Sequence, residues 1–293
     1  MKTCVDCIPC FVDHGVHNAK MASADPETVK AMVAKVLDEL GRHPYEMPPP
    51  FMARKINQIV RAASQGRDLY IEEKDNSTRF AHEVLISIQE ELSAQPDQFE
   101  AAVRLSIAGN IIDYGVDRTF KLDSAKARIV EAFDAPLDRA AIKSLQNAME
   151  RAKDILYITD NCGEAVFDRL LIEPFKGKVT LAVRGQPILN DLTRRELASS
   201  GLDGLAAKLI DTGDCTPGVC FEHSSKEFID AFNSAELIVA KGQGNYETLS
   251  DTKRPVFFLF RAKCKVVTDS LGGVPKGSFQ VCGVNIPAAL SGL

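Results

Sequence analysis

Apolar residues in the first half of the chain recur at the spacing of an α-helix. In DPETVKAMVAKVLDEL, residues 25–40, they return every three or four positions, and Asp25 followed by Pro26 is a typical helix start. The same pattern continues in three further stretches: residues 51–64, 77–94 and 99–115. We therefore expect residues 1–148 to form a mainly helical bundle domain. Within it the proline-rich HPYEMPPPF, residues 43–51, is expected to be a rigid extended connector.

The pattern changes after about residue 148, where short apolar runs begin to alternate with helical segments. Five runs rich in β-branched or aromatic residues are typical of buried strands: residues 154–160, 178–185, 207–213, 236–242 and 255–262. Three segments between them are long enough for crossover helices: residues 163–175, 190–200 and 224–235. We therefore expect residues 149–293 to form a Rossmann-like, three-layer α/β domain with a mainly parallel sheet. The predicted fold class is α/β, with an N-terminal helical domain.

Composition and charge narrow the classes of partner. The 293 residues are 45% hydrophobic and 26% charged, which is a globular composition. The net charge of −5 argues against a general affinity for nucleic acid, which needs clustered Lys and Arg. No apolar run approaches the roughly 20 residues that span a bilayer, and the first residues lack the apolar core of a signal peptide. We expect a cytoplasmic protein that binds a small molecule, with neither nucleic acid nor membrane as a partner.

The residues that end the predicted strands carry the candidate chemistry, because ligands of open α/β sheets bind beyond the carboxyl ends of the strands. The first run ends in Asp160-Asn161, and the second in Arg184 followed by Asp191. The third ends in Asp211-Thr212-Gly213 and the fourth in KGQGN, residues 241–245. Two carboxylates and an amide oxygen are ligands that Mg²⁺ or Mn²⁺ prefers, so these strand ends predict a metal site.

Structural alternatives exist for the same residues. Asp160 at a strand-to-helix junction is equally typical of a helix cap. Glu164 and Asp168 fall in the first turns of the next helix, where acids favour the helix dipole, so we expect them to be structural. Asp211 and Asp214 suit either a supporting role or a solvated turn. In KGQGN the glycines form either a simple turn or a backbone that approaches an anion beside Lys241.

Eight cysteines occur without any sign of export, so reduced thiols are expected. Cys4, Cys7 and Cys10 have a C-x-x-C-x-x-C spacing that suits zinc, an iron–sulfur cluster or a redox pair, with His14 and His17 nearby. Packing of reduced thiols against the helical bundle is the favoured interpretation. The other cysteines are expected to be small core residues.

Several of these stretches together resemble the damage-control phosphatase family, formerly a domain of unknown function numbered 89. The resemblance is carried by DNCGEAVFD, GQPILND, DTGDCTPGV and AKGQGNYETL, with AGNIIDYG in the helical half and CIPC near the start. It spans nearly the whole chain. The short chain and its N-terminal cysteines are similar to the prokaryotic branch of that family.

The resemblance implies a metal-dependent phosphatase that acts on damaged or surplus phosphometabolites. Carried over motif by motif, it places the metal ligands at Asp160, Asn161 and Asp191, and a catalytic, phosphate-facing lysine at Lys241. The implied cofactor is a divalent ion, Mn²⁺, Mg²⁺, Co²⁺ or Ni²⁺, and the implied substrates are phosphate monoesters such as sugar phosphates or phosphopantetheine-type esters. The further substrate-binding candidates are Asn110, Asp113, Arg184, Gly242, Gly244 and Asn245.

Two other functions fit the same residues. A transferase would use the strand-end glycines and acids to hold adenosylmethionine or a nucleotide, as in carboxyl methyltransferases, although no G-x-G-x-x-G follows the first strand. A protein that binds a metal or a phosphometabolite without turnover would use the same ligands. Measurement of activity separates these classes.

Overall fold

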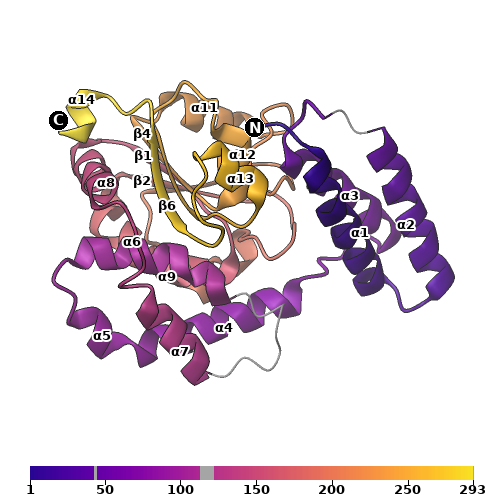
Figure 1. Cartoon of the computed structure of the whole chain (residues 1–293), viewed down its shortest axis with the longest axis horizontal. Coiled ribbons are helices and arrows are strands. Elements are labelled where there is room, and N and C mark those ends of the chain that lie inside the picture. Colours follow the sequence, from indigo (N-terminus) through magenta and orange to yellow (C-terminus); the bar gives the residue numbers. More distant parts are fainter. Residues whose placement is uncertain (43–44, 113–121, 293) are drawn as a thin grey trace.

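A six-stranded sheet lies at the centre of the computed structural model, which describes residues 1–42, 45–112 and 122–292 (Figure 1). The strand order is β3-β2-β1-β4-β5-β6. The parallel strands are β1 (Ile155–Ile158), β2 (Val179–Val183), β3 (Lys208–Asp211), β4 (Leu237–Lys241) and β5 (Val256–Arg261). Each lies within one of the five predicted runs. The order reverses between β1 and β4, which places the ligand crevice at their carboxyl ends.

The sixth strand, β6 (Phe279–Val284), was not predicted and runs antiparallel to β5. Its sequence FQVCGV includes a glycine and lies at the edge of the sheet, so it lacks the continuous apolar run of a central strand. The edge position explains why the apolar pattern did not reveal it.

Helices precede and connect these strands. The helices before the sheet are α1 (Ile8–Ala22), α2 (Pro26–Gly41), α3 (Pro49–Ala63), α4 (Ile71–Ser87), α5 (Gln89–Ser93), α6 (Gln98–Ala108), α7 (Leu122–Glu131) and α8 (Arg139–Arg151). Those that follow are α9 (Cys162–Ile172), α10 (Leu197–Ser200), α11 (Lys226–Ser234), α12 (Gln243–Leu249), α13 (Lys265–Ser270) and α14 (Ala288–Ser291). Short 3₁₀ turns are η1 (Val5–Cys7), η2 (Gly109–Ile112), η3 (Glu173–Lys178) and η4 (Arg194–Glu196).

The helical half of the chain is divided between two places (Figure 1). Helices α1 to α3 lie together at one end of the molecule around small apolar clusters of their own, which include Phe11, Val36 and Met52. Helices α4 and α6 instead pack against α9 and share its core with the sheet. The expected extended connector ends at Pro48, because Pro49 and Pro50 form the first turn of α3, where proline is tolerated.

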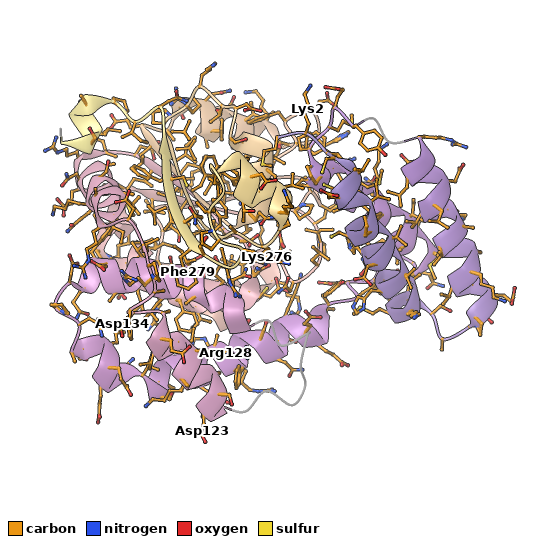
Figure 2. The ribbon with its side chains drawn as sticks, in the orientation of Figure 1. Lys2, Asp123, Arg128, Asp134, Lys276 and Phe279 are labelled. Atoms are coloured by element: carbon orange, nitrogen blue, oxygen red, sulfur yellow. The ribbon has the colours of Figure 1, made fainter. Side chains whose placement is uncertain are left out.

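The sheet is covered on both faces, as expected for three layers. One face packs against α4, α6, α8 and α9, and the other against α11 and α12 through Leu156, Ile158 and Phe258. Side chains fill the space between sheet and helices, whereas charged ones such as Asp123 project outward (Figure 2). Among the described residues, no helix combines the length and apolar character needed to cross a membrane.

Candidate active site

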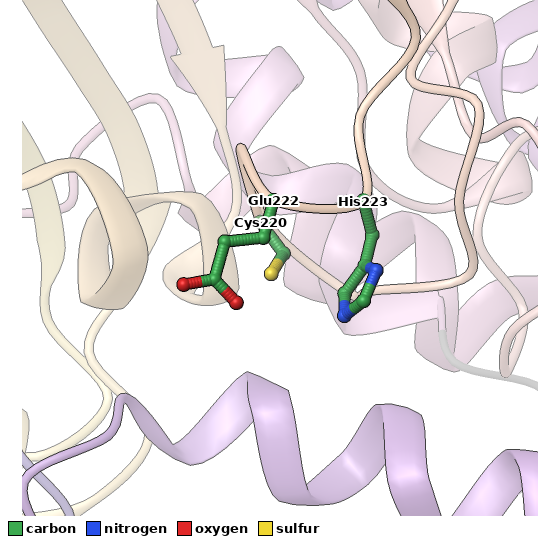
Figure 3. A group of neighbouring side chains, drawn as sticks. All are labelled: Cys220, Glu222 and His223. Carbon is green, nitrogen blue, oxygen red and sulfur yellow. The ribbon is translucent and has the colours of Figure 1, made fainter.

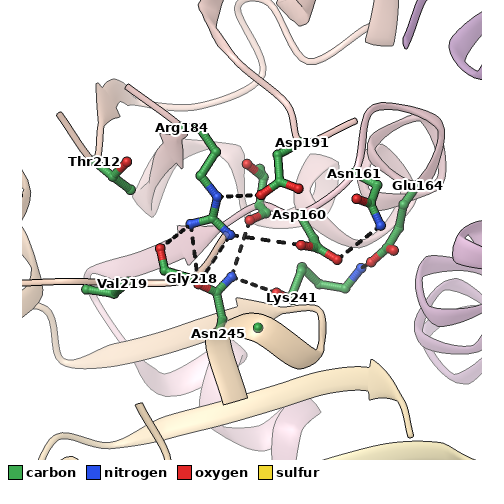
Figure 4. Close-up of polar contacts among 12 residues, drawn as sticks. Asp160, Asn161, Glu164, Arg184, Asp191, Thr212, Gly218, Val219, Lys241 and Asn245 are labelled. Atoms are coloured by element: carbon green, nitrogen blue, oxygen red, sulfur yellow. Dashed lines mark hydrogen bonds and ion pairs between the residues drawn. The ribbon is translucent and has the colours of Figure 1, made fainter. Parts of the chain in front are cut away.

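The segment after β1 and the loop after β2 lie side by side at the predicted crevice (Figure 4). The Leu192 N–H donates to Asp160 O at 2.8 Å, and the Cys162 N–H donates to Asn190 O at 2.9 Å. These bonds form a short antiparallel bridge between Asn161 and Asp191. Backbone pairing therefore brings together the three residues that the sequence predicted as metal ligands.

Helix capping does not account for Asp160 and Asn161. Asn161 is the N-cap residue of α9, yet its side chain makes no capping hydrogen bond. Its Nδ2 instead donates to Asp160 Oδ2 at 3.1 Å. A cap residue whose amide oxygen is not needed by the helix is available as a neutral metal ligand.

Arg184 is the cation that fixes this group of side chains. It is 1% exposed, and its Nε donates to Asp191 Oδ2 at 2.7 Å. Its Nη1 donates to Gly218 O at 2.7 Å, and its two terminal nitrogens lie 3.4 Å from Asn245 Oδ1. Its Nη2 also lies 3.9 Å from Asp160 Oδ1. Arg184 thus orients the carboxylates, and Asn245 in turn holds the guanidinium (Figure 4).

Lys241 occupies a second buried network below the strand ends. Its Nζ donates to Glu164, to Asp168 Oδ1 at 2.8 Å and to Ser106 O at 2.7 Å. Asn110 Nδ2 donates to the other oxygen of Glu164 at 2.9 Å. Glu164 and Asp168 therefore form ion pairs with Lys241. The ammonium is fully enclosed in these contacts, so its predicted contact with phosphate stays a prediction.

The glycines of KGQGN are required by close contacts with other chain segments. Gly242 has φ +80°, and a Cβ there would lie 2.1 Å from Asp160 Oδ2. A Cβ on Gly244 would lie 1.9 Å from Pro217 O. The Gly242 N–H donates to Leu259 O at 3.0 Å, so this amide is used within the sheet. Gly242 thus allows the Asp160 carboxylate to lie directly against the end of β4.

Buried charge around the crevice is unbalanced in favour of negative groups. The two hydrogen-bonded networks contain four buried carboxylates, Asp160, Asp191, Glu164 and Asp168, and two buried cations, Arg184 and Lys241; Glu247 is a further buried carboxyl group on the cavity wall. If all six are ionised, two negative charges are in excess. Burial, together with the neighbouring carboxylates, holds the pKa of Asp160 well above its usual range, and burial raises the pKa of Asp191. A divalent cation would neutralise this excess, so the residues present fit a metal ion.

A cavity of about 540 Å³ opens next to Asp160, Asn161 and Asp191. The strand-end side of its wall also includes Gln243, Gly244, Glu247 and Lys263. The opposite side comes from the helical half: Asp13 and His17 of α1, Pro49, Pro50 and Ala53 of α3, then Tyr70 and Glu73. The cavity therefore lies between the three-helix unit and the carboxyl ends of the strands.

Four of the predicted site residues line this cavity, namely Asp160, Asn161, Asp191 and Gly244. Arg184, Lys241, Gly242, Asn245 and Asn110 lie behind them in the networks described above. Asp113 lies outside the described residues. Asp211 and Asp214 instead form ion pairs, with Arg194 at 2.7 Å and with Arg54 at 2.9 Å.

Sequence reasoning missed three residues on the cavity wall that carry chemistry. Lys263 is the one described lysine or arginine on the wall, and it follows the end of β5. Glu247 lies on α12, one helical turn beyond Gln243. Asp13 lies on α1, four residues before His17. Lys263 could have been found by applying the strand-end rule to the fifth run as well.

The cysteines form only loose groupings among the described residues. Cys4 Sγ lies 3.8 Å from Cys7 Sγ, while Cys10 is exposed. Among the described residues, Cys220, Glu222 and His223 have potential ligand atoms within 4.8 Å of one another (Figure 3). All three come from one loop, and Glu222 and His223 are exposed. The N-terminal cysteines form no such group of three within the described residues.

The sequence and the fold both match a known family. A family model described as the damage-control phosphatase ARMT1-like domain matches residues 3–278. The chain belongs to the damage-control phosphatase family. This confirms the family that the sequence motifs predicted.

Relatives of this damage-control phosphatase family member are similar over almost their entire length. A damage-control phosphatase of Pyrococcus horikoshii is 35% identical over 288 residues, covering 96% of this chain and 98% of the relative. A damage-control phosphatase of Archaeoglobus fulgidus is 32% identical, covering 93% and 96%. The crystal structure of a DUF89 family protein from P. horikoshii superposes with a TM-score of 0.85 at 34% identity, covering 95% and 98%. The likeness confirms the predicted fold class.

Proposed function

We propose that this protein is a divalent-metal-dependent phosphatase that hydrolyses phosphate monoesters of small metabolites. The observation that carries the proposal is the pair of buried carboxylates, Asp160 and Asp191, that share Arg184 as a cation at the edge of an open cavity. Family membership supports phosphatase chemistry, and the donor set supports the metal. Mn²⁺, Mg²⁺, Co²⁺ and Ni²⁺ all accept carboxylate and amide oxygens.

Asp160, Asn161 and Asp191 would hold the metal, and Arg184 and Asn245 would keep the two carboxylates in position. The metal, when bound, supplies Lewis-acid stabilisation of charge on a phosphoryl oxygen. Burial raises the pKa of both Asp160 and Asp191, and the positive charge of Lys263, which lies on the cavity wall, opposes this effect. The Lys263 ammonium would therefore bind the remaining phosphoryl oxygens. The sequence motifs assign this role to Lys241, whose ammonium already contacts Glu164, Asp168 and Ser106.

The composition of the cavity wall favours a polyhydroxylated substrate. The side opposite the strand ends presents Asp13, His17 and Glu73, which can form hydrogen bonds with hydroxyl groups. Such a wall suits a sugar phosphate better than the long, partly apolar arm of a phosphopantetheine-type ester. Sugar phosphates are therefore the preferred substrate class.

The test is phosphate release by metal-stripped protein to which Mn²⁺, Mg²⁺, Co²⁺ or Ni²⁺ is restored singly. The substrates are an aryl phosphate, a series of hexose and pentose phosphates, and phosphopantetheine. We expect release only with metal, and faster release from sugar phosphates than from phosphopantetheine. Asp160→Ala is expected to abolish both metal binding and release.

Asp211→Ala is the matched control, since Asp211 also ends a strand of the same sheet but pairs with Arg194 away from the cavity wall. It is expected to retain metal binding and activity. Wild-type protein that binds metal but releases no phosphate from any ester would refute the phosphatase. An Asp160→Ala variant that keeps normal metal binding and turnover would refute the ligand assignment.

A further inference from the structure

Glu247 is a buried carboxyl group on the wall of the catalytic cavity. It lies on α12, is 8% exposed, and shares the cavity with Asp160 and Asp191. The other described wall carboxylates outside the predicted metal ligands are Asp13, which is exposed, and Glu73, which is half-buried. Apart from the predicted metal ligands, Glu247 is thus the most buried of these wall carboxyl groups.

A chain of hydrogen bonds orients Glu247. The Lys263 N–H donates to Gln243 Oε1 at 2.8 Å, which fixes the direction of the Gln243 amide. Gln243 Nε2 is thereby turned toward Glu247 and donates to its Oε1 at 2.8 Å. One oxygen of Glu247 is therefore occupied by a neutral donor from its own helix. Because Glu247 Oε1 accepts this hydrogen bond, the proton of the neutral carboxyl group would lie on Oε2.

The surroundings of Glu247 favour its protonated form near neutral pH. Burial raises its pKa to about 7, against the opposing effects of Gln243, the N-terminal ammonium and Lys263. The Met1 ammonium donates to Glu247 O at 2.8 Å, so it faces the backbone end of the residue. The Cys7 and Cys264 thiols also lie near Glu247; burial raises the pKa of both, and the Glu247 charge raises it further. A carboxylic acid poised near the working pH is suited to general acid catalysis.

We infer that Glu247 is the general acid that protonates the leaving oxygen of the phosphate monoester, an inference that rests on the proposed function. As a water oxygen bonds to phosphorus and the ester P–O bond breaks, the Glu247 proton passes to the departing alkoxide oxygen, which leaves as an alcohol. The attacking water retains its two protons on the product, dihydrogen phosphate, and Glu247 becomes a carboxylate. One of those protons then returns to Glu247, and hydrogen phosphate leaves.

General acid catalysis is needed only when the leaving group is a poor one. The experiment therefore compares two monoesters, the alkyl ester glycerol phosphate and 4-nitrophenyl phosphate, whose phenolate leaves without a proton. In Glu247→Gln, kcat for glycerol phosphate is expected to fall by about 10²-fold or more, while kcat for 4-nitrophenyl phosphate stays nearly unchanged. Wild-type kcat for glycerol phosphate is expected to decline above about pH 7 as Glu247 loses its proton, and this decline should be absent in the variant.

Asp13→Asn is the matched control, because it removes a second carboxylate from the same cavity wall without touching α12. Because Asp13 is proposed to contact substrate hydroxyl groups, the variant is expected to raise KM for glycerol phosphate, while the ratio of kcat between the two esters stays as in the wild type. Equal losses on both esters in Glu247→Gln, or no loss on glycerol phosphate, would overturn the assignment while leaving the phosphatase intact. Wild-type protein that releases phosphate from neither ester with any metal would instead refute the proposed function, and the inference would fall with it.

Discussion

Arg184 Nε lies 2.7 Å from Asp191 Oδ2, and the two side chains are 1% and 3% exposed. Removal of the arginine leaves Asp191 and Asp160 without their nearest cation in a buried site. Arg184→Gln is therefore expected to lower the free energy of unfolding of the metal-free protein by about 3–5 kcal/mol. Urea denaturation of metal-stripped protein measures this loss.

Arg194→Gln provides the comparison for Arg184. The Arg194 and Asp211 side chains are 48% and 28% exposed, so water already screens their ion pair. Its loss is expected to cost about 1 kcal/mol or less. Similar losses in the two variants would show that Arg184 is not the electrostatic support of the site.

Gly242→Ala tests the close approach of β4 to Asp160. The new Cβ would meet the Asp160 carboxylate and would also require φ +80° from alanine. Because displacement of an oriented ligand weakens a metal site, the affinity for Mn²⁺ is expected to fall by about 10- to 100-fold, as measured by calorimetric titration. Gly204→Ala requires a similar φ, +72°, but has no atom within 4 Å of its Cβ. It should lose stability through backbone strain and keep its metal affinity.

The two lysines near the crevice should respond differently to substitution by methionine. Lys241→Met leaves Glu164 and Asp168 buried without their cation, so a loss of about 3–5 kcal/mol in the free energy of unfolding is expected. Lys263→Met changes an exposed residue, and its stability should stay within about 0.5 kcal/mol of the wild type. Its kcat/KM should nevertheless fall by about 10²-fold if Lys263 binds the phosphoryl group. Full activity in Lys263→Met would remove it from the proposed mechanism.

The buried His14 side chain is expected to make the folded protein less stable in mild acid. Burial lowers its pKa from 6.5 to about 4, and Asn18 Nδ2 lies 2.8 Å from its Nε2. Between these pH values the unfolded chain takes up a proton that the folded protein excludes, so stability falls as the pH drops through this window. The expected loss from pH 7 to pH 5 is up to about 2 kcal/mol. Urea denaturation at both pH values should show a smaller decrease in His14→Gln than in the wild type.

The sequence predicted those parts of the site that depend on local pattern. Strands β1 and β2 are mostly apolar runs, and the rule for strand ends predicts Asp160 and Asp191 in one crevice from the sequence alone. The helical pattern likewise predicted α2, α3 and α4. To predict these features, one needs only the residues within each element and the general topology of α/β sheets.

Contacts between distant segments could not be predicted in this way. The carboxylate partners of Lys241 lie 73 and 77 positions earlier in the chain, and nothing in KGQGN indicates that the ammonium turns toward them. The same holds for Asp13, whose place on the cavity wall depends on how α1 packs against α3 and on how α3 meets the sheet. Helix packing of this kind is decided by the shape of whole surfaces.

Helix α3 is attached to the loops beside the cavity by Arg54, which lies 2.9 Å from Asp214, and by Asn57 Nδ2, which donates to Pro187 O at 3.1 Å. Helices α1 and α3 therefore form much of the cavity side opposite the strand ends without contributing to the core beneath the sheet. During evolution, mutations on α1 and α3 can alter which metabolite is accepted while the strand ends conserve bond cleavage. Under the proposed function, substrate choice and bond cleavage are thus assigned to separate parts of the chain, which lets the first change without disturbing the second.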